Sequence, residues 1–302
     1  MWLLFTLVFV WTACPHQVAI IDDDATYLKR TAGMWVSDLG NSDEKVRRAA
    51  AFALSKMGKH AVPYLREIRA ALERESAISV RISLANCLGE LGPLASSEVV
   101  DIIMQRWKTE REVSVQRALV TSLGKLGEAG RAAESLLAQS LESRDGPLAQ
   151  QAVWSLGQLG QVSEPTLLKL MKLGTSDQSS IRCEVMSALG NLGPAALEGL
   201  PVLLRGLSDA NATVQEQSVL ALRKMGPAAS KSILPLISLA EDARAEPGLR
   251  QAALLSLESV WSTGLKEPAA WQRLQSLATV AIPESVRVSA MQAEKKIAPL
   301  RK

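Results

Sequence analysis

The sequence predicts an all-α protein in which about eight helical hairpins are stacked in tandem as an α-solenoid. Three observations predict this fold class. A 13-residue phrase recurs along the 302 residues, each copy carries apolar residues at helical spacing, and only 4% of the residues are aromatic although 47% are hydrophobic. Leucine and alanine must therefore fill the interior, which favours helices over a β-sandwich.

The phrase begins at intervals of 33 to 37 residues and accounts, with its preceding segments, for nearly all of the chain after residue 25. Its eight copies start at Val46, Val80, Val115, Leu148, Ile181, Val214, Leu249 and Val286. A period of this length is the signature of a repeat architecture, in which each unit buries its apolar face against its neighbours. We therefore expect one elongated array over residues 21–302.

Each copy of the phrase predicts one α-helix. Counted from 0 at its first residue, the apolar positions are 0, 4, 8 and 11, which form one stripe of a helix. Six copies end in glycine, which suits a left-handed conformation beyond the helix end, and proline follows Gly92, Gly193 and Gly226. A second apolar segment precedes the phrase, for example at 197–207 or 233–239. Each unit is therefore expected to be a helical hairpin.

The pattern Pro-x-Leu…Leu-x-Asp…Val-Arg-x-x-Ala-Ala-x-Ala-Leu-Gly-x-Leu-Gly resembles HEAT repeats of the bacterial, phycobilisome-lyase-like kind. Pro63, Pro201 and Pro235 match the family's proline in the first helix. The resemblance implies a right-handed superhelix whose second helices line a concave face, and it leaves the activity open. In the last two units Trp261 replaces the terminal glycine and Glu294 replaces a core leucine, which a capping role would explain.

Arginine occupies position 1 of the phrase in five copies. These residues are Arg47, Arg81, Arg182, Arg250 and Arg287. They resemble the arginine of the family's Asp-Arg ladder, which bonds loop carboxylates and backbone carbonyls between units. We expect a structural role, because a guanidinium group with fixed partners specifies how units stack.

Positions 2, 6 and 10 of the phrase lie off the apolar stripe and are expected to face the concave groove. Several of them are apolar or cationic, which suits an amphipathic peptide or protein surface, since Trp and Arg dominate interface energetics. The predicted partner-binding residues are Phe52, Trp154, Leu220, Leu255, Arg48, Arg117 and Lys125. An error of one residue in the helical phase would instead place Trp154 in packing between units.

Catalytic groups are scarce, because the chain has two histidines and three cysteines. We therefore predict a protein that is not an enzyme, with no catalytic, cofactor or metal site. Gln17 and Ala61 follow the two histidines, where the HEAT-repeat hydroxylases have the glutamate that helps to bind iron. Cys87 and Cys183 are expected to be small buried residues, with chromophore attachment at Cys183 as the alternative.

Two other classes of function stay open. One is a phycobilisome-lyase-like chromophore lyase or chaperone, and the other is a HEAT-like nucleic-acid-binding protein. The net charge is only +3 and its signs alternate along the chain, so no nucleic-acid partner is predicted. The sequence leaves the identity of the partner and the oligomeric state open.

Residues 1–20 are predicted to be a signal peptide or a lipoprotein-type segment. The apolar run at 2–13 is too short to span a bilayer but suits an export signal, although no Lys or Arg precedes it. Ala13-Cys14 resembles the cleavage site of bacterial lipoproteins, with Cys14 as the lipidated residue and Trp11 as a departure. We expect an exported protein, periplasmic or anchored to the membrane through its N-terminus, with a cytoplasmic location as the alternative.

Overall fold

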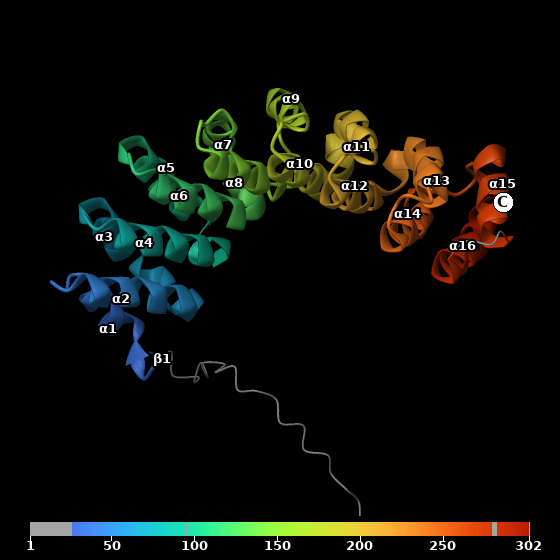
Figure 1. The fold of residues 1–302 in the computed structure, drawn as a ribbon. Coiled ribbons are helices and arrows are strands. Elements are labelled where there is room, and N and C mark those ends of the chain that lie inside the picture. The colour runs from blue at the N-terminus through green and yellow to red at the C-terminus, as the bar shows by residue number, and fades with distance from the viewer. Residues whose placement is uncertain (1–25, 95, 280–282, 302) are drawn as a thin grey trace, which may run out of the picture.

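A computed structural model describes residues 26–94, 96–279 and 283–301, and it shows helical hairpins stacked in sequence order into a curved rod (Figure 1). The predicted all-α solenoid is confirmed over this part of the chain. The segment 1–20 and Cys14, predicted as an export signal and a lipidation site, lie outside the described residues. Within the described ranges, no helix is long and apolar enough to cross a membrane.

The helices form two layers. We call those on the hollow side of the arc the inner helices and those on the opposite side the outer helices (Figure 1). The inner helices are α2 (Glu44–Met57), α4 (Ile78–Leu91), α6 (Val113–Lys125), α8 (Gly146–Gly157), α10 (Ser179–Leu192), α12 (Ala212–Met225), α14 (Pro247–Val260) and α16 (Glu284–Ile297). The outer helices are α3 (Leu65–Arg74), α5 (Ser96–Thr109), α7 (Glu134–Ser140), α9 (Glu164–Leu173), α11 (Leu200–Gly206), α13 (Ile233–Glu241) and α15 (Pro268–Thr279).

Each inner helix contains one copy of the phrase, and its ends follow from local chemistry. The side chains of Asp43, Asp145 and Asn211 accept hydrogen bonds from backbone N–H groups in the first turns of α2, α8 and α12. At the other end, Gly193 has φ 59° and ψ −139°, and Gly226 has φ 61° and ψ −143°. This region is essentially restricted to glycine, so the chain can turn sharply there into the next unit.

Gly92 departs from the predicted left-handed ending. It keeps a helical conformation, with φ −52° and ψ −43°, and its backbone amide donates to the Leu88 carbonyl. A Cβ atom here would overlap Cδ2 of Leu126 from the following unit. Gly92 is therefore needed for close packing between units rather than for a positive φ.

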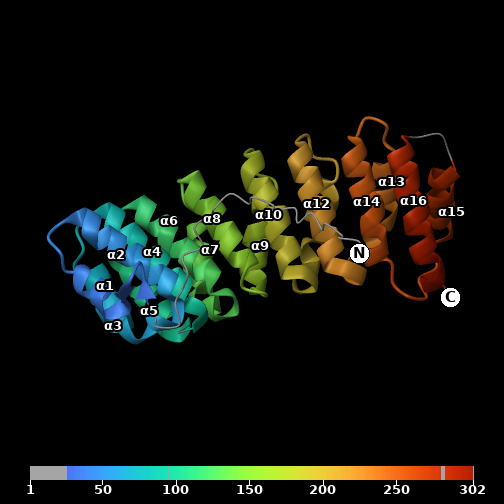
Figure 2. The same ribbon diagram turned by 90° about the horizontal axis from the view of Figure 1, so that it is seen from below.

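The inner helices lie side by side in one row (Figure 2). From α2 to α12 they pack against one another through small residues at position 9 of one unit and position 7 of the next. A Cβ atom on Gly157 would lie 2.7 Å from Cα of Ala188, and one on Gly190 would lie 2.6 Å from Cα of Ala221. Elsewhere in the row, the buried Ser155 hydroxyl donates to the Val120 carbonyl at 2.8 Å. The absence of large side chains in this part of the row thus allows adjacent helices to approach closely. In the last three units, position 9 is occupied by Arg223, Glu258 and Lys295 instead.

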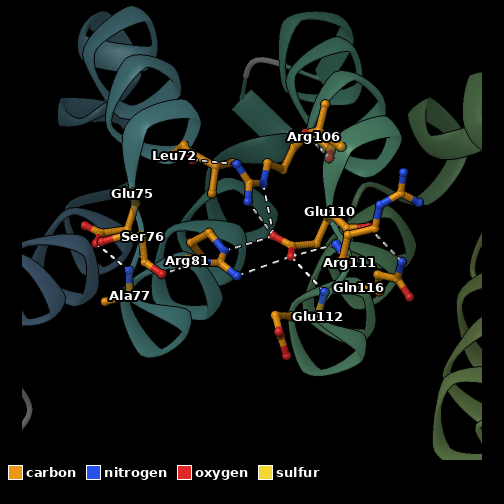
Figure 3. A network of polar contacts seen from close by, with 11 residues as sticks. Leu72, Glu75, Ser76, Ala77, Arg81, Arg106, Glu110, Arg111, Glu112 and Gln116 are labelled. Atoms are coloured by element: carbon orange, nitrogen blue, oxygen red, sulfur yellow. Dashed lines mark hydrogen bonds and ion pairs between the residues drawn. The ribbon is translucent and has the colours of Figure 1, made fainter.

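The predicted arginine ladder is confirmed at three junctions between units. Arg47 binds Glu75 at 2.7 and 2.9 Å, Arg81 binds Glu110 at 2.9 and 3.2 Å, and Arg182 binds Asp209 at 2.8 and 2.7 Å. Each carboxylate lies five residues before the next phrase and also accepts a backbone N–H of its own turn. Figure 3 shows Arg81 and Arg106 converging on Glu110.

The ladder is not continuous. Gln116, Ala149 and Gln215 replace the arginine in three units. Arg250 is buried and donates to the Ala240 carbonyl at 2.7 Å, whereas Arg287 lies 3.7 Å from Glu284 of its own helix. The structural role therefore holds fully for the three ladder arginines that reach a carboxylate of the next unit.

The N-terminal end of the array carries a cap that the sequence did not predict. Strands β1 (Thr26–Tyr27) and β2 (Arg30–Thr31) form an antiparallel hairpin, followed by helix α1 (Ala32–Asp38). Trp35 is buried and its indole N–H donates to the Tyr27 carbonyl at 3.2 Å. The hairpin and α1 thus pack on the side of α2 that faces away from α4 (Figure 1).

Trp261 does not have the capping role expected of it. It is only 2% exposed, and its indole N–H donates to the Leu265 carbonyl. Its ring packs edge-on against that of Trp271 on α15, with 6.4 Å between the ring centroids. The prediction was wrong because the side chain points into the last junction rather than out of the array. Glu294, in contrast, is partly exposed and accepts a hydrogen bond from Gln275 at 3.1 Å.

Candidate functional site

Exposed apolar side chains mark the concave face of the array. At position 6 of the phrase, Phe52 of α2 is 52% exposed, Leu220 of α12 is 41% exposed and Leu255 of α14 is 38% exposed. The inner helices carry these residues on the side away from the outer helices, and Figure 2 shows the inner helices in one row. The face therefore presents isolated apolar groups along its length.

Trp154 of α8 forms the wall of a hollow near the C-terminal ends of α4, α6 and α8. The hollow has a volume of about 420 Å³, and its other lining residues are Gly89, Glu90, Gly124, Lys125, Gly127 and Gln158. The indole ring lies so close to α6 that a Cβ atom on Gly124 would be 2.5 Å from its Cζ3 atom. Glycines thus form the floor of the hollow and leave one side of the half-buried Trp154 open.

Cationic groups surround these apolar groups. The Lys125 ammonium lies 2.7 Å from the Glu90 carboxylate at the edge of the hollow, and the Lys56 ammonium lies 5.2 Å from the Phe52 ring centroid. Arg48 is exposed, while Nε of Arg117 is buried and has no hydrogen-bond partner among the described residues. This donor is unsatisfied but enclosed, so it is not itself a contact for a ligand on the face.

The chemistry of the face changes along the array. Burial raises the pKa of Glu184 on α10, and a hydrogen bond with Gln150 opposes this shift only in part. Glu216 on α12 is exposed. The concave face is therefore cationic around α2 and α6 and carries carboxyl groups around α10 and α12.

The described cysteines are not activated thiols. Burial raises the pKa of Cys87 to about 12, and burial followed by the charges of Glu184 and Glu216 raises the pKa of Cys183. Cys87 is fully buried, as expected, whereas Cys183 is only partly buried. Among residues 26–94, 96–279 and 283–301, no group of three or more His, Cys, Asp or Glu side chains could hold a metal ion.

The structure brings only some of the predicted partner-binding residues together. Trp154 and Lys125 line one hollow, and Arg117 lies two turns before Lys125 on α6, whereas Phe52 and Leu255 lie several units apart. Gly89 and Gly124, which also line the hollow, were not predicted as site residues. Each is the glycine of a Leu-Gly pair near the end of the phrase, a pair that the repeat pattern alone accounts for. Partner binding at these residues stays a prediction.

The fold and this face define an α-solenoid of tandem helical hairpins with an open concave surface. A family model described as HEAT repeats matches residues 65–157 and 133–223, and one described as PBS lyase HEAT-like repeat matches residues 46–68. The matches cover more than half of the chain. The protein belongs to the HEAT-repeat family, as its repeat pattern indicated.

Solved structures support the same fold. One is an engineered protein with 19% identity and a TM-score of 0.56, in which the match covers 88% of this chain and 78% of that chain. Another is the complex of CpcE and CpcF of phycocyanin lyase from Nostoc sp. PCC7120, with 18% identity, a TM-score of 0.48, and coverage of 89% and 95%. No curated protein matches this sequence. At these identities the likeness shows the fold alone.

The prediction that this protein is not an enzyme is corrected. The family model that matches residues 46–68 is described as a PBS lyase HEAT-like repeat, and the structure from Nostoc is that of a phycocyanin lyase. A small number of histidines and cysteines does not by itself exclude catalysis by this chain.

Proposed function

We propose that this protein is an interaction scaffold that binds a peptide or protein partner along its concave face. The observation that carries the proposal is the set of apolar side chains exposed there, above all Phe52, Leu220 and Leu255, together with the open side of Trp154. Apolar anchors separated by polar groups are typical of a surface that recognises an amphipathic chain.

The shape of the array supports the same proposal. Its inner helices are fixed by glycine contacts and by buried hydrogen bonds, so the anchors are held in place before a partner arrives. Rigid presentation lowers the entropy cost of binding. Charge would orient the partner, because acidic side chains are favoured near Arg48 and Arg117 and disfavoured near Glu184 and Glu216.

The test is a quantitative cross-linking pull-down from the native host with the double variant Phe52→Ala/Trp154→Ala. Each truncated anchor is expected to cost about 1–2 kcal/mol, so recovery of the partner falls at least tenfold. The matched control is Leu168→Ala/Leu234→Ala, which removes exposed apolar side chains from the outer helices α9 and α13. Equal recovery with both double variants would contradict the proposal.

We further propose that the protein is exported, on the basis of the apolar run at 2–13 and the Ala13-Cys14 pair. Cell fractionation combined with mass analysis of the N-terminus tests this proposal. A chain that begins at Cys14 and carries lipid is the expected product of lipoprotein processing. A cytoplasmic chain that retains Met1 would contradict export.

A further inference from the structure

A large cavity lies at a junction where the arginine ladder is interrupted. This junction pocket has a volume of about 740 Å³ and lies where the outer helices α11 and α13 end and the inner helices α12 and α14 begin (Figure 1). Its lining residues are Leu204, Leu207, Ser208, Ala212, Gln215, Glu216, Pro235, Ser238, Leu239, Asp242, Arg244, Ala245, Glu246 and Leu249.

Gln215 and Arg244 occupy the two positions that form the ladder elsewhere. Gln215 is at position 1 of its phrase, and Arg244 lies five residues before the next phrase. Instead of crossing the junction, Gln215 donates to the Asp209 carbonyl of its own unit at 2.8 Å. Arg244 binds Asp242 in its own turn at 3.0 Å and is 92% exposed. No side chain therefore fills the space that a ladder arginine would occupy.

Other junctions show the same relation between the ladder and empty space. The junction bridged by Arg81 and Glu110 has a hollow of about 310 Å³ beside Arg106. Where Ala149 replaces the arginine, the junction next to Ser176 has a cavity of about 680 Å³. The cavities beside Gln215 and Ala149, at two junctions that lack the ladder arginine, are thus larger than the hollow at the junction bridged by Arg81.

The lining of the junction pocket suits a cation on an aliphatic stem. Glu216 and Glu246 are exposed and have no hydrogen bond or ion pair from their side chains within the described ranges. A third carboxylate, Asp242, is already paired with Arg244, so the two glutamates are the groups available to a cation. Leu207, Leu239 and other aliphatic side chains form the inner walls. Arg182 with Asp209, one junction earlier, shows how a guanidinium group is held at this edge of the array.

We propose that the junction pocket binds an arginine side chain of a partner protein or peptide, which takes the place of the missing ladder arginine. The planar guanidinium group can engage two carboxylates at once, whereas an ammonium group acts as a single point charge. The methylene stem would pack against the leucine walls. This site is separate from the Trp154 hollow, so it goes beyond the proposed function and does not depend on it.

The test uses N-acetyl-arginine N-methylamide as the probe, with the corresponding citrulline and lysine compounds as controls. Binding to the full chain is followed by the NMR shifts of backbone amides. We expect the arginine probe to shift amides at 204–216 and 235–249 and to bind on the order of tenfold more tightly than neutral citrulline, and more tightly than lysine. Shifts elsewhere, equal affinities, or no arginine binding would overturn the proposal.

Two variants distinguish arginine binding in the junction pocket from a general effect of surface charge on probe binding. Glu216→Gln/Glu246→Gln is expected to weaken arginine binding about tenfold without changing the melting temperature, because both side chains are exposed. Gln215→Arg/Arg244→Glu rebuilds the ladder inside the pocket and is expected to abolish probe binding while raising the melting temperature. Unchanged arginine binding in either variant would overturn the proposal, and Phe52→Ala/Trp154→Ala should leave it intact.

Discussion

The ion pair between Arg81 and Glu110 is the most buried part of the ladder, with the two residues 7% and 3% exposed. Removal of one partner leaves a charge uncompensated in a poorly solvated junction. We expect Arg81→Met to lower the free energy of unfolding by about 3 kcal/mol. This value is at the lower end of the range for a broken buried ion pair because Arg106 still binds Glu110. Urea denaturation measures the loss.

The matched control for this prediction is Arg69→Met. Arg69 pairs with Glu73 on α3, and both side chains are well exposed. An exposed pair contributes less than about 1 kcal/mol. Similar losses in the two variants would contradict the account of the ladder.

Glu110 also makes stability depend on pH. Burial raises its pKa, but hydrogen bonds from Arg106, the Glu112 amide and Arg81 outweigh this effect and hold the pKa at about 2, against 4.5 for a free glutamate. Because the folded-state pKa is the lower one, the stabilisation is complete above about pH 4.5 and is lost as the pH falls toward 2. At pH 3 about 2 kcal/mol of it should be gone.

The measurement compares wild type with Glu110→Gln by urea unfolding at pH 7 and pH 3. The variant should be less stable at pH 7, and the difference should shrink at pH 3, because the wild type then loses the same interaction. Glu73→Gln, at an exposed carboxylate, serves as the control and should change little with pH. A difference for Glu110→Gln that is equal at both pH values would refute the assignment.

At the residue scale, the spacing of the repeat predicted five ladder arginines, of which Arg47, Arg81 and Arg182 bind a carboxylate of the next unit. It did not predict the partners. Glu75 and Glu110 stand where the family pattern has aspartate, and only the folded turn shows that each carboxylate also accepts a backbone N–H. Nor did the sequence show that Gln215 turns back to its own unit and leaves a cavity.

At the scale of the helices, the close approach of neighbouring inner helices from α2 to α12 depends on a small residue at position 9 of the phrase. We expect Gly157→Ala to destabilise the protein by about 1–3 kcal/mol, because the added Cβ atom would lie 2.7 Å from Cα of Ala188 on the next inner helix. The intrinsic preference of alanine for helices favours the substitution by about 1 kcal/mol and is included in this range. Thermal unfolding measures the net effect.

Gly248→Ala is the control for this substitution. Gly248 lies in α14, and an added Cβ atom would meet nothing within 4 Å. This variant should be neutral or more stable by less than about 1 kcal/mol. If Gly157→Ala were equally well tolerated, the inner helices could not be as closely packed as described.

The helices themselves were predictable because apolar periodicity and glycine endings agree in most units. The N-terminal hairpin was not. Its turn residues Leu28 and Lys29 have φ values of 50° and 62°, and neither is the glycine or asparagine that normally marks such a turn. Tertiary contacts, including the cation–π contact of Arg30 with Trp35 at 4.0 Å, stabilise this turn instead.

At the scale of the whole molecule, the tandem period predicted a single array with one concave face. Which anchors cooperate depends on the spacing between units, and the structure places Trp154 and Lys125 in one hollow but leaves Phe52 and Leu255 apart. The sequence could rank residue types on the face but could not place them relative to one another. An extended partner that contacts several units is the ligand that this spacing favours.

The most direct test of concave-face binding is site-specific photo-cross-linking in the native host. A photoreactive phenylalanine analogue would replace Thr121 or Leu168. Thr121 is at position 6 of the phrase on α6, one turn before Gly124 and Lys125 of the Trp154 hollow, whereas Leu168 is exposed on the outer helix α9. We expect one adduct that forms at position 121 and disappears when Phe52→Ala/Trp154→Ala is added, with none at position 168. The same adduct from both positions, or an adduct at 121 that survives the double substitution, would contradict concave-face binding.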